Sequence, residues 1–287
     1  MRALIFGASG QVGMPVLSRL RAAGWSMDAT SRVARGDVDG VTWHCGSLDA
    51  PPPTLPAACE AIFSCGPLDA FARWYAANGI DCPRVVAFGS TSARVKHGSP
   101  DPAERDVAMR LAEAEASLLG VARERGAAAT VLRPTLVYGA GRDATLTRIA
   151  VLARRRGVFP LPRGARGLRQ PVHVEDLADA AVACLRAPAA AGRAFDLPGG
   201  ETLEYREMVA RVLACLQPPA RLLELPAPLF ELALRAAGVL GFGAGPGDAA
   251  VARMREDLVF DAGAAVRELG YAPRPFRPEA MMFDPPG

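Results

Sequence analysis

The chain has 287 residues, enough for two domains of about 150 residues or for one large domain. Half of the residues are hydrophobic, 22% are charged and the mean hydropathy is +0.13, which excludes a disordered, collagen-like or coiled-coil chain. The net charge of +3 is too small for a nucleic-acid-binding surface. We therefore expect a folded protein that does not bind nucleic acid.

Cysteines and histidines show no metal-ligand pattern. The six cysteines include no C-x-x-C pair and the three histidines lie far apart, so no metal site is expected. The chain opens directly into an apolar strand rather than a signal peptide, which indicates free thiols in the reducing cytoplasm. The longest apolar segment, residues 228–242, is shorter than the ~20 residues that span a bilayer and is expected to be a packed helix.

Short apolar runs alternate with helical patterns through the first two thirds of the chain. We expect strands at 2–6, 26–31, 61–64, 84–88 and 128–133, and helices at 12–23, 69–78 and 103–125. The strands are continuously apolar, as in a parallel sheet that helices cover on both faces. The sequence therefore predicts an α/β fold with a doubly wound parallel sheet.

Past residue 142 the pattern changes to helix-rich segments broken by glycine and proline. Further strands are expected near 170–174 and 193–197, a helix at 175–185 and a loop at 241–247. We expect residues 1–165 to form the sheet domain, with residues 166–198 returning to it. Residues 199–287 are expected to form a small, mainly helical C-terminal lobe.

A glycine-rich segment, G-A-S-G-Q-V-G at residues 7–13, follows the first strand and opens the first helix. Glycines there permit a tight turn and let the backbone approach a pyrophosphate, while the helix N-terminus attracts phosphate charge. In this context the motif predicts a dinucleotide-binding site, with a purely structural turn as the alternative.

The end of the second strand bears on the choice of dinucleotide. Arg32 stands where a carboxylate would bind the ribose hydroxyls of NAD. A guanidinium there favours the 2′-phosphate of NADP, while NAD and a solvated surface arginine remain alternatives. The residues expected to bind the cofactor are Gly7, Ser9, Gly10, Gln11, Val12, Gly13 and Arg32.

The glycine spacing resembles that of the short-chain dehydrogenase/reductase superfamily, in its extended branch, the NAD-dependent epimerase/dehydratase family. Four further stretches are similar to that family and occur in its order: F-G-S-T-S at 88–92, R-P-T-L-V-Y-G at 133–139, P-V-H-V-E-D-L-A at 171–178 and E-L-G-Y-A-P at 268–273. The resemblance covers nearly the whole chain and implies a Rossmann fold that binds NAD(P).

One part of the family pattern is missing. Catalysis in the family uses a Ser or Thr after the fifth strand and a Y-x-x-x-K one helix later. Thr91 falls on the Ser/Thr position, but Val107 and Leu111 stand where the tyrosine and lysine would be, and no tyrosine is followed by lysine four places on. The chain is therefore similar to the atypical branch, which includes reductases and isomerases with relocated catalytic groups and NADP-binding sensor or structural proteins.

Three residues are catalytic candidates. Thr91 could hold a substrate carbonyl or could cap the next loop by bonding to backbone. Lys96, the only lysine of the chain, could act as an acid or electrostatic stabiliser if desolvation moved its pKa toward neutrality, or could be a solvated surface lysine. Tyr138 is expected to border the cleft between the lobes, as a proton donor or as a packing aromatic. His173 is expected to organise the start of the next helix rather than to react.

The sequence leaves three functions open. The glycine loop and Thr91 favour an NADP-dependent oxidoreductase or epimerase/dehydratase-type enzyme, whereas the missing Y-x-x-x-K favours an NADP(H)-binding sensor or partner-binding protein without turnover. A nucleotide-sugar epimerase fits the family resemblance and the arginines between positions 154 and 169, because guanidinium groups bind phosphate. The expected partners are a small, anionic substrate and, as an open question, a second copy of the chain.

Overall fold

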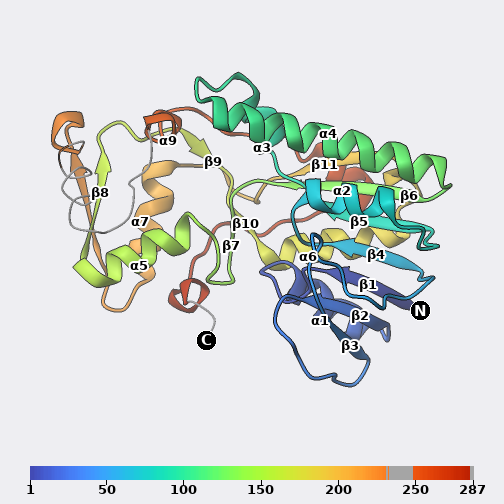
Figure 1. Cartoon of the computed structure of the whole chain (residues 1–287). Helices are drawn as coiled ribbons and strands as arrows, with labels where there is room; N and C mark the ends of the chain where they lie inside the picture. Colours follow the sequence, from blue (N-terminus) through green and yellow to red (C-terminus); the bar gives the residue numbers. More distant parts are fainter. Residues whose placement is uncertain (231, 233–247, 285–287) are drawn as a thin grey trace.

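A parallel sheet of seven strands forms the centre of the computed structural model, which describes residues 1–230, 232 and 248–284 (Figure 1). The strand order is β11-β6-β5-β4-β1-β2-β3. The strands are β1 (Arg2–Phe6), β2 (Ser26–Ser31), β3 (Val41–Cys45), β4 (Ala61–Ser64), β5 (Arg84–Phe88), β6 (Ala128–Pro134) and β11 (Arg193–Leu197). The expected α/β fold with a doubly wound parallel sheet is confirmed.

Helices cover both faces of this sheet and explain its continuously apolar strands. Alternate side chains of β1 enter different cores: Ala3 and Ile5 pack beneath α1 (Gly13–Ala22) and α6 (Val174–Ala183). Leu4 and Phe6 pack on the other face, beneath α2 (Leu68–Ala77) and α4 (Pro102–Glu124). Both sides of the strand are therefore buried, and no polar alternation appears in its sequence.

The expected elements of residues 1–134 agree with the structure to within one residue at each end. The strand β3 was not predicted; it is an edge strand that pairs with β2 alone and buries fully only Val41. Such a strand lacks the apolar run that marks the central strands. The helix expected at 228–242 and the loop at 241–247 fall mostly outside the described residues.

A second hydrophobic core joins two stretches of the chain beside the sheet (Figure 1). It contains α5 (Leu146–Arg156), α7 (Tyr205–Cys215), and β8 (Val158–Pro162) paired in parallel with β13 (Arg221–Leu225). Residues 146–162 thus share a core with residues 203–225, and the domain boundaries remain a prediction. The other elements are α3 (Ser92–Val95), η1 (Lys96–Gly98), β7 (Val137–Tyr138), β9 (Leu168–Arg169), β10 (Val172–His173), η2 (Cys184–Arg186), η3 (Pro188–Ala190), β12 (Leu203–Glu204), α9 (Asp248–Arg253), α10 (Gly263–Leu269) and η4 (Ala280–Phe283).

Three general features bear on the class of protein. Among the described residues, no helix is long and apolar enough to cross a membrane. The six cysteines are free thiols. In the same part of the chain, no group of three or more His, Cys, Asp or Glu side chains is placed to hold a metal ion.

Candidate functional site

The glycine loop between β1 and α1 has a shape that only glycine permits. Gly7 has a φ of +69°, and the Gly10 amide donates to its carbonyl oxygen over 2.9 Å. A Cβ on Gly13 would lie 2.1 Å from that oxygen and 2.7 Å from Ala8 Cα, while a Cβ on Gly7 would lie 3.1 Å from the backbone of Cys65. The loop therefore leaves bare backbone at the N-terminus of α1, as a pyrophosphate requires.

The other expected cofactor residues lie around this loop in different settings. Gln11 has a buried side-chain oxygen without a hydrogen-bond partner, so it can accept a bond from a ligand. Val12 is buried in the core beneath α1 and supports the loop from inside. Arg32 is exposed directly after β2. Arg142, from the loop before α5, donates to the Ser9 carbonyl oxygen over 2.6 Å.

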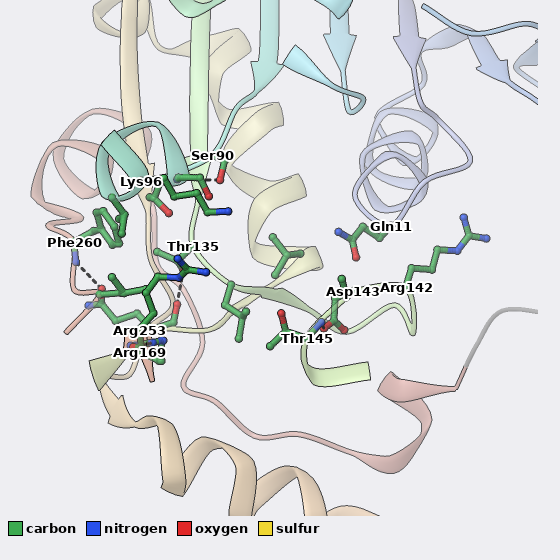
Figure 2. A pocket seen from close by; sticks show the side chains of 18 residues that line it. Gln11, Ser90, Lys96, Thr135, Arg142, Asp143, Thr145, Arg169, Arg253 and Phe260 are labelled. Carbon is green, nitrogen blue, oxygen red and sulfur yellow. Dashed lines mark hydrogen bonds between the residues drawn. The ribbon is translucent and has the colours of Figure 1, made fainter. Parts of the chain in front are cut away.

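A cavity of about 500 Å³ opens beside the glycine loop (Figure 2). It lies at the carboxyl ends of β5 and β6, where ligands of open α/β sheets bind. Its lining combines the glycine loop, the segment after β5, the segment between β6 and α5, β9 and the C-terminal part of the chain. The lining residues are Gln11, Ser90, Thr91, Ser92, Val95, Lys96, Thr135, Leu136, Val137, Arg142, Asp143, Ala144, Thr145, Arg169, Gln170, Arg253, Leu258 and Phe260.

Thr91 lines this cavity at the end of β5. Its side chain is nearly buried, and its hydroxyl donates to the Pro134 carbonyl oxygen over 3.1 Å. A hydroxyl has one proton to donate and can accept further bonds. To donate to a substrate carbonyl, Thr91 would have to turn its proton away from Pro134.

Lys96 lines the same cavity and comes from η1. Its side chain is 27% exposed, and its Nζ lies 3.5 Å from Glu104 Oε1. The cavity also contains Asp143, but that carboxylate already accepts bonds from the amides of residues 145–147 and from the Thr147 hydroxyl at the start of α5. Because arginine keeps its proton in proteins, Lys96 is the described lining residue best suited to transfer one.

Tyr138 does not line the cavity. Its side chain is 1% exposed and packs edge-on against His173 and Phe276, with ring centroids 5.0 and 4.9 Å away. Burial raises the pKa of the Tyr138 phenol to about 12. The structure thus brings Thr91 and Lys96 together and leaves Tyr138 in the second core.

His173 caps α6, as expected. Its Nδ1 accepts a hydrogen bond from the Glu175 amide over 3.2 Å. Its Nε2 is buried without a partner, close to Gly139, where an added Cβ would lie 2.5 Å from it. Burial lowers the pKa of this imidazole, and the charge of Arg274 lowers it further.

Among the arginines between positions 154 and 169, Arg169 alone is a described lining residue of the cavity. Arg154 donates to the carbonyl oxygens of Ala280 and Phe283 in η4, and Arg163 and Arg166 are exposed. Arg169 reaches the cavity, but its guanidinium donates to the backbone carbonyls of residues 168, 253 and 256. Burial lowers its pKa. These contacts hold the turn after α9 in place.

Two cations of the cavity had not been predicted. Arg253 ends α9, and no motif marks it in the sequence. Arg142 follows the V-Y-G stretch by three residues, so its place in the family pattern was the one available signal. With Lys96 and Arg169 they make four cationic side chains among the described lining residues, against one carboxylate, that of Asp143.

Comparison with known proteins agrees with this architecture. Residues 80–197 match the NAD dependent epimerase/dehydratase family. A UDP-glucose 4-epimerase of Vibrio cholerae is 30% identical over 129 residues, which are 44% of this chain and 38% of that protein. The chain matches less than half the length of its curated relatives.

Solved structures share the fold over the whole chain. An epimerase of Methanothermobacter thermautotrophicus superposes with a TM-score of 0.71 at 15% identity, covering 98% of this chain and 90% of that one. A UDP-glucose 4-epimerase of Thermotoga maritima with UDP-glucose gives 0.69 at 16% identity, covering 99% and 97%. The chain is an α/β protein of the Rossmann type. Its resemblance to the NAD-dependent epimerase/dehydratase family is confirmed.

Proposed function

We propose that the protein is an NAD(P)-dependent oxidoreductase or epimerase/dehydratase-type enzyme that acts on a small anionic substrate. The observation that carries this proposal is the shared cavity, which joins Gln11 of the glycine loop to Thr91 and Lys96 and to the cations of the opposite wall. Cofactor, reacting groups and substrate charge would all meet in this one space.

The glycine loop and Arg32 would hold the cofactor, with NADP preferred over NAD. The bare backbone at Gly7, Gly10 and Gly13 and the unpaired oxygen of Gln11 support a bound dinucleotide. When bound, the nicotinamide supplies hydride transfer. Arg32 is exposed directly after β2, where its guanidinium could bind a 2′-phosphate.

Within the cavity, Thr91 would orient the substrate oxygen and Lys96 would exchange the proton that accompanies hydride transfer. Lys96 faces the cavity, whereas Tyr138 is buried away from it and its raised pKa opposes ionisation. Lys96 is therefore the better candidate for the proton, and Tyr138 is retained as the alternative.

The cationic lining supports a phosphorylated substrate, and nucleotide sugars are the first class to test. The similar proteins of Vibrio cholerae and Thermotoga maritima are UDP-glucose 4-epimerases. A second function, NADP(H) binding without turnover, is favoured by one observation: Lys96 already pairs with Glu104 and is not free to react. The six free thiols support a cytoplasmic location for either function.

Nicotinamide fluorescence during titration with NADPH and NADH tests the cofactor. We expect NADPH to bind more tightly, and Arg32→Asp to reverse the preference by about tenfold, since a carboxylate repels the 2′-phosphate and accepts ribose hydroxyls. Arg21→Asp, an exposed charge reversal on α1, is the matched control and should bind as wild type. Failure of both nucleotides to bind would overturn the proposal. NADPH binding without conversion of any UDP-sugar would favour the second function.

A further inference from the structure

Glu104 connects two cations that face the cavity from different parts of the chain. Its Oε1 lies 3.5 Å from Lys96 Nζ in η1, and its Oε2 accepts a bond from the guanidinium of Arg253 at the end of α9. Lys96 and Arg253 both line the cavity, on the left of the view in Figure 2, whereas Glu104 does not. The carboxylate therefore lies behind the two cations and is shared between them.

The fold keeps Glu104 ionised. The residue lies in the first turn of α4, where the helix N-terminus favours a negative charge. Burial alone would raise the pKa of its carboxyl, but hydrogen bonds from Ser99 and Arg253 hold that pKa below its ordinary value. The Ser99 hydroxyl donates to Oε2 over 2.7 Å. Both oxygens are thus occupied, and nine tenths of the residue is buried.

The other charges of the cavity are already engaged. Arg169 donates to three backbone carbonyls and Arg142 to one, while Asp143 caps α5. Lys96 and Arg253 are the remaining pair, and one carboxylate balances two positive charges. Lys96 and Arg253 thus share a single carboxylate, and this partner is a side chain that an anionic ligand can replace.

We propose that Glu104 is an internal counter-ion that competes with substrate for Lys96 and Arg253 and so selects a dianionic group such as a diphosphate. The inference rests on the proposed function, because it assigns the substrate charge of the same cavity. A dianion neutralises both cations and can displace the carboxylate. A monoanion would only replace the single negative charge of Glu104 by its own. An uncharged group would form no ion pair to compensate for separating Glu104 from Lys96 and Arg253.

Glu104→Gln tests this by removing the competitor and keeping the size of the side chain. Calorimetric titration of the full chain with UDP should show about tenfold tighter binding than wild type, because both cations become free. Uridine, which carries no phosphate, should bind equally weakly to both proteins. A merely structural role for Glu104 predicts the opposite result, since loss of the ion pairs would loosen the wall and weaken UDP binding.

Arg253→Gln should weaken UDP binding by about tenfold, and the double variant Glu104→Gln/Arg253→Gln should lose most of the gain. Glu113→Gln, on the exposed face of α4, and Arg255→Gln, two residues after Arg253, are the matched controls and should bind UDP as wild type. Inorganic pyrophosphate, titrated in parallel, tests the charge requirement without the nucleoside. If pyrophosphate binds at this wall rather than at the glycine loop, its affinity should fall in Arg253→Gln.

Unchanged or weaker binding of both UDP and pyrophosphate to Glu104→Gln overturns the inference. If that variant does not fold by thermal melting, equal UDP binding to wild type and to Arg253→Gln still overturns the inference, because Arg253 is one of the two cations for which substrate and Glu104 would compete. NADPH titration of every variant tests the proposed function separately. If no variant binds NADPH but Glu104→Gln still binds pyrophosphate more tightly than wild type, the proposed function is wrong and the counter-ion role of Glu104 stands.

Discussion

The two sides of the cavity are built in different ways. The glycine-loop side comes from one stretch of seven residues, and its properties are those of the backbone: a positive φ at Gly7 and no space for a Cβ at Gly13. On the cationic wall, Lys96 lies near Glu104 in the sequence, but Arg253 comes from a distant part of the chain and only the tertiary fold brings it to them. The first side is a local structure that suits many phosphates, whereas the second can differ between proteins that share the loop.

This difference predicts that changes on the two sides affect different steps. A change in the cationic wall should alter substrate binding or turnover and leave cofactor binding unchanged. A change in the glycine loop should remove cofactor binding itself. Cofactor affinity and turnover, measured on the same variants, therefore separate the two sides.

Lys96→Gln should have the largest effect. If Lys96 exchanges the proton, turnover of a UDP-sugar substrate should fall by about 10²- to 10⁴-fold, because glutamine has no proton to transfer at neutral pH. NADPH affinity should remain that of wild type, since the lysine lies on the other side of the cavity. Steady-state kinetics and nicotinamide fluorescence measure the two quantities.

Tyr138→Phe is the comparison for that experiment. Its ring packing against His173 and Phe276 is retained in phenylalanine, so turnover should change by no more than about twofold. If turnover fell further in Tyr138→Phe than in Lys96→Gln, Tyr138 rather than Lys96 would be the residue that exchanges the proton. His97→Gln, which replaces an exposed side chain beside Lys96, should be indistinguishable from wild type.

Gly13→Ala should have the next largest effect and act on the other side. A Cβ there would lie 2.1 Å from the Gly7 carbonyl oxygen, so the backbone must move, and a cost of about 3 kcal/mol would weaken NADPH binding about 100-fold. Gly120→Ala in α4 is the matched control, because a Cβ there meets no atom within 4 Å. It should bind NADPH normally and raise the melting temperature, since alanine favours a helix. Equal NADPH binding by Gly13→Ala and wild type would contradict the role of the loop.

The same difference explains what could be predicted from the sequence. The central strands are continuously apolar because helices cover both faces of the sheet, and the glycine loop needs no distant partner. Both could therefore be predicted from short stretches of sequence. Lys96 and Thr91 were found by their distance from the end of one strand. Glu104 and Arg253 were not, because 149 residues separate them and an exposed Glu-Arg pair is common on helices. The burial of Tyr138 could not be predicted either, because it depends on packing against Phe276, which is distant in the sequence.

His173 belongs to neither side and should give the smallest effect, visible in stability rather than in catalysis. Burial and then the charge of Arg274 lower its pKa, while the carboxylates of Asp176 and Glu175 oppose this shift. The unfolded chain therefore takes up the proton more readily, so the stabilisation is complete above the ordinary pKa of about 6.5 and is lost as pH falls below it. His173→Asn can still accept the Glu175 amide bond but cannot titrate, so its free energy of unfolding should depend less on pH between about 5 and 8. Urea unfolding across this range measures the difference, with His97→Asn as the exposed control that keeps the wild-type slope. Parallel curves for His173→Asn and wild type would mean that the imidazole is already solvated in the folded protein.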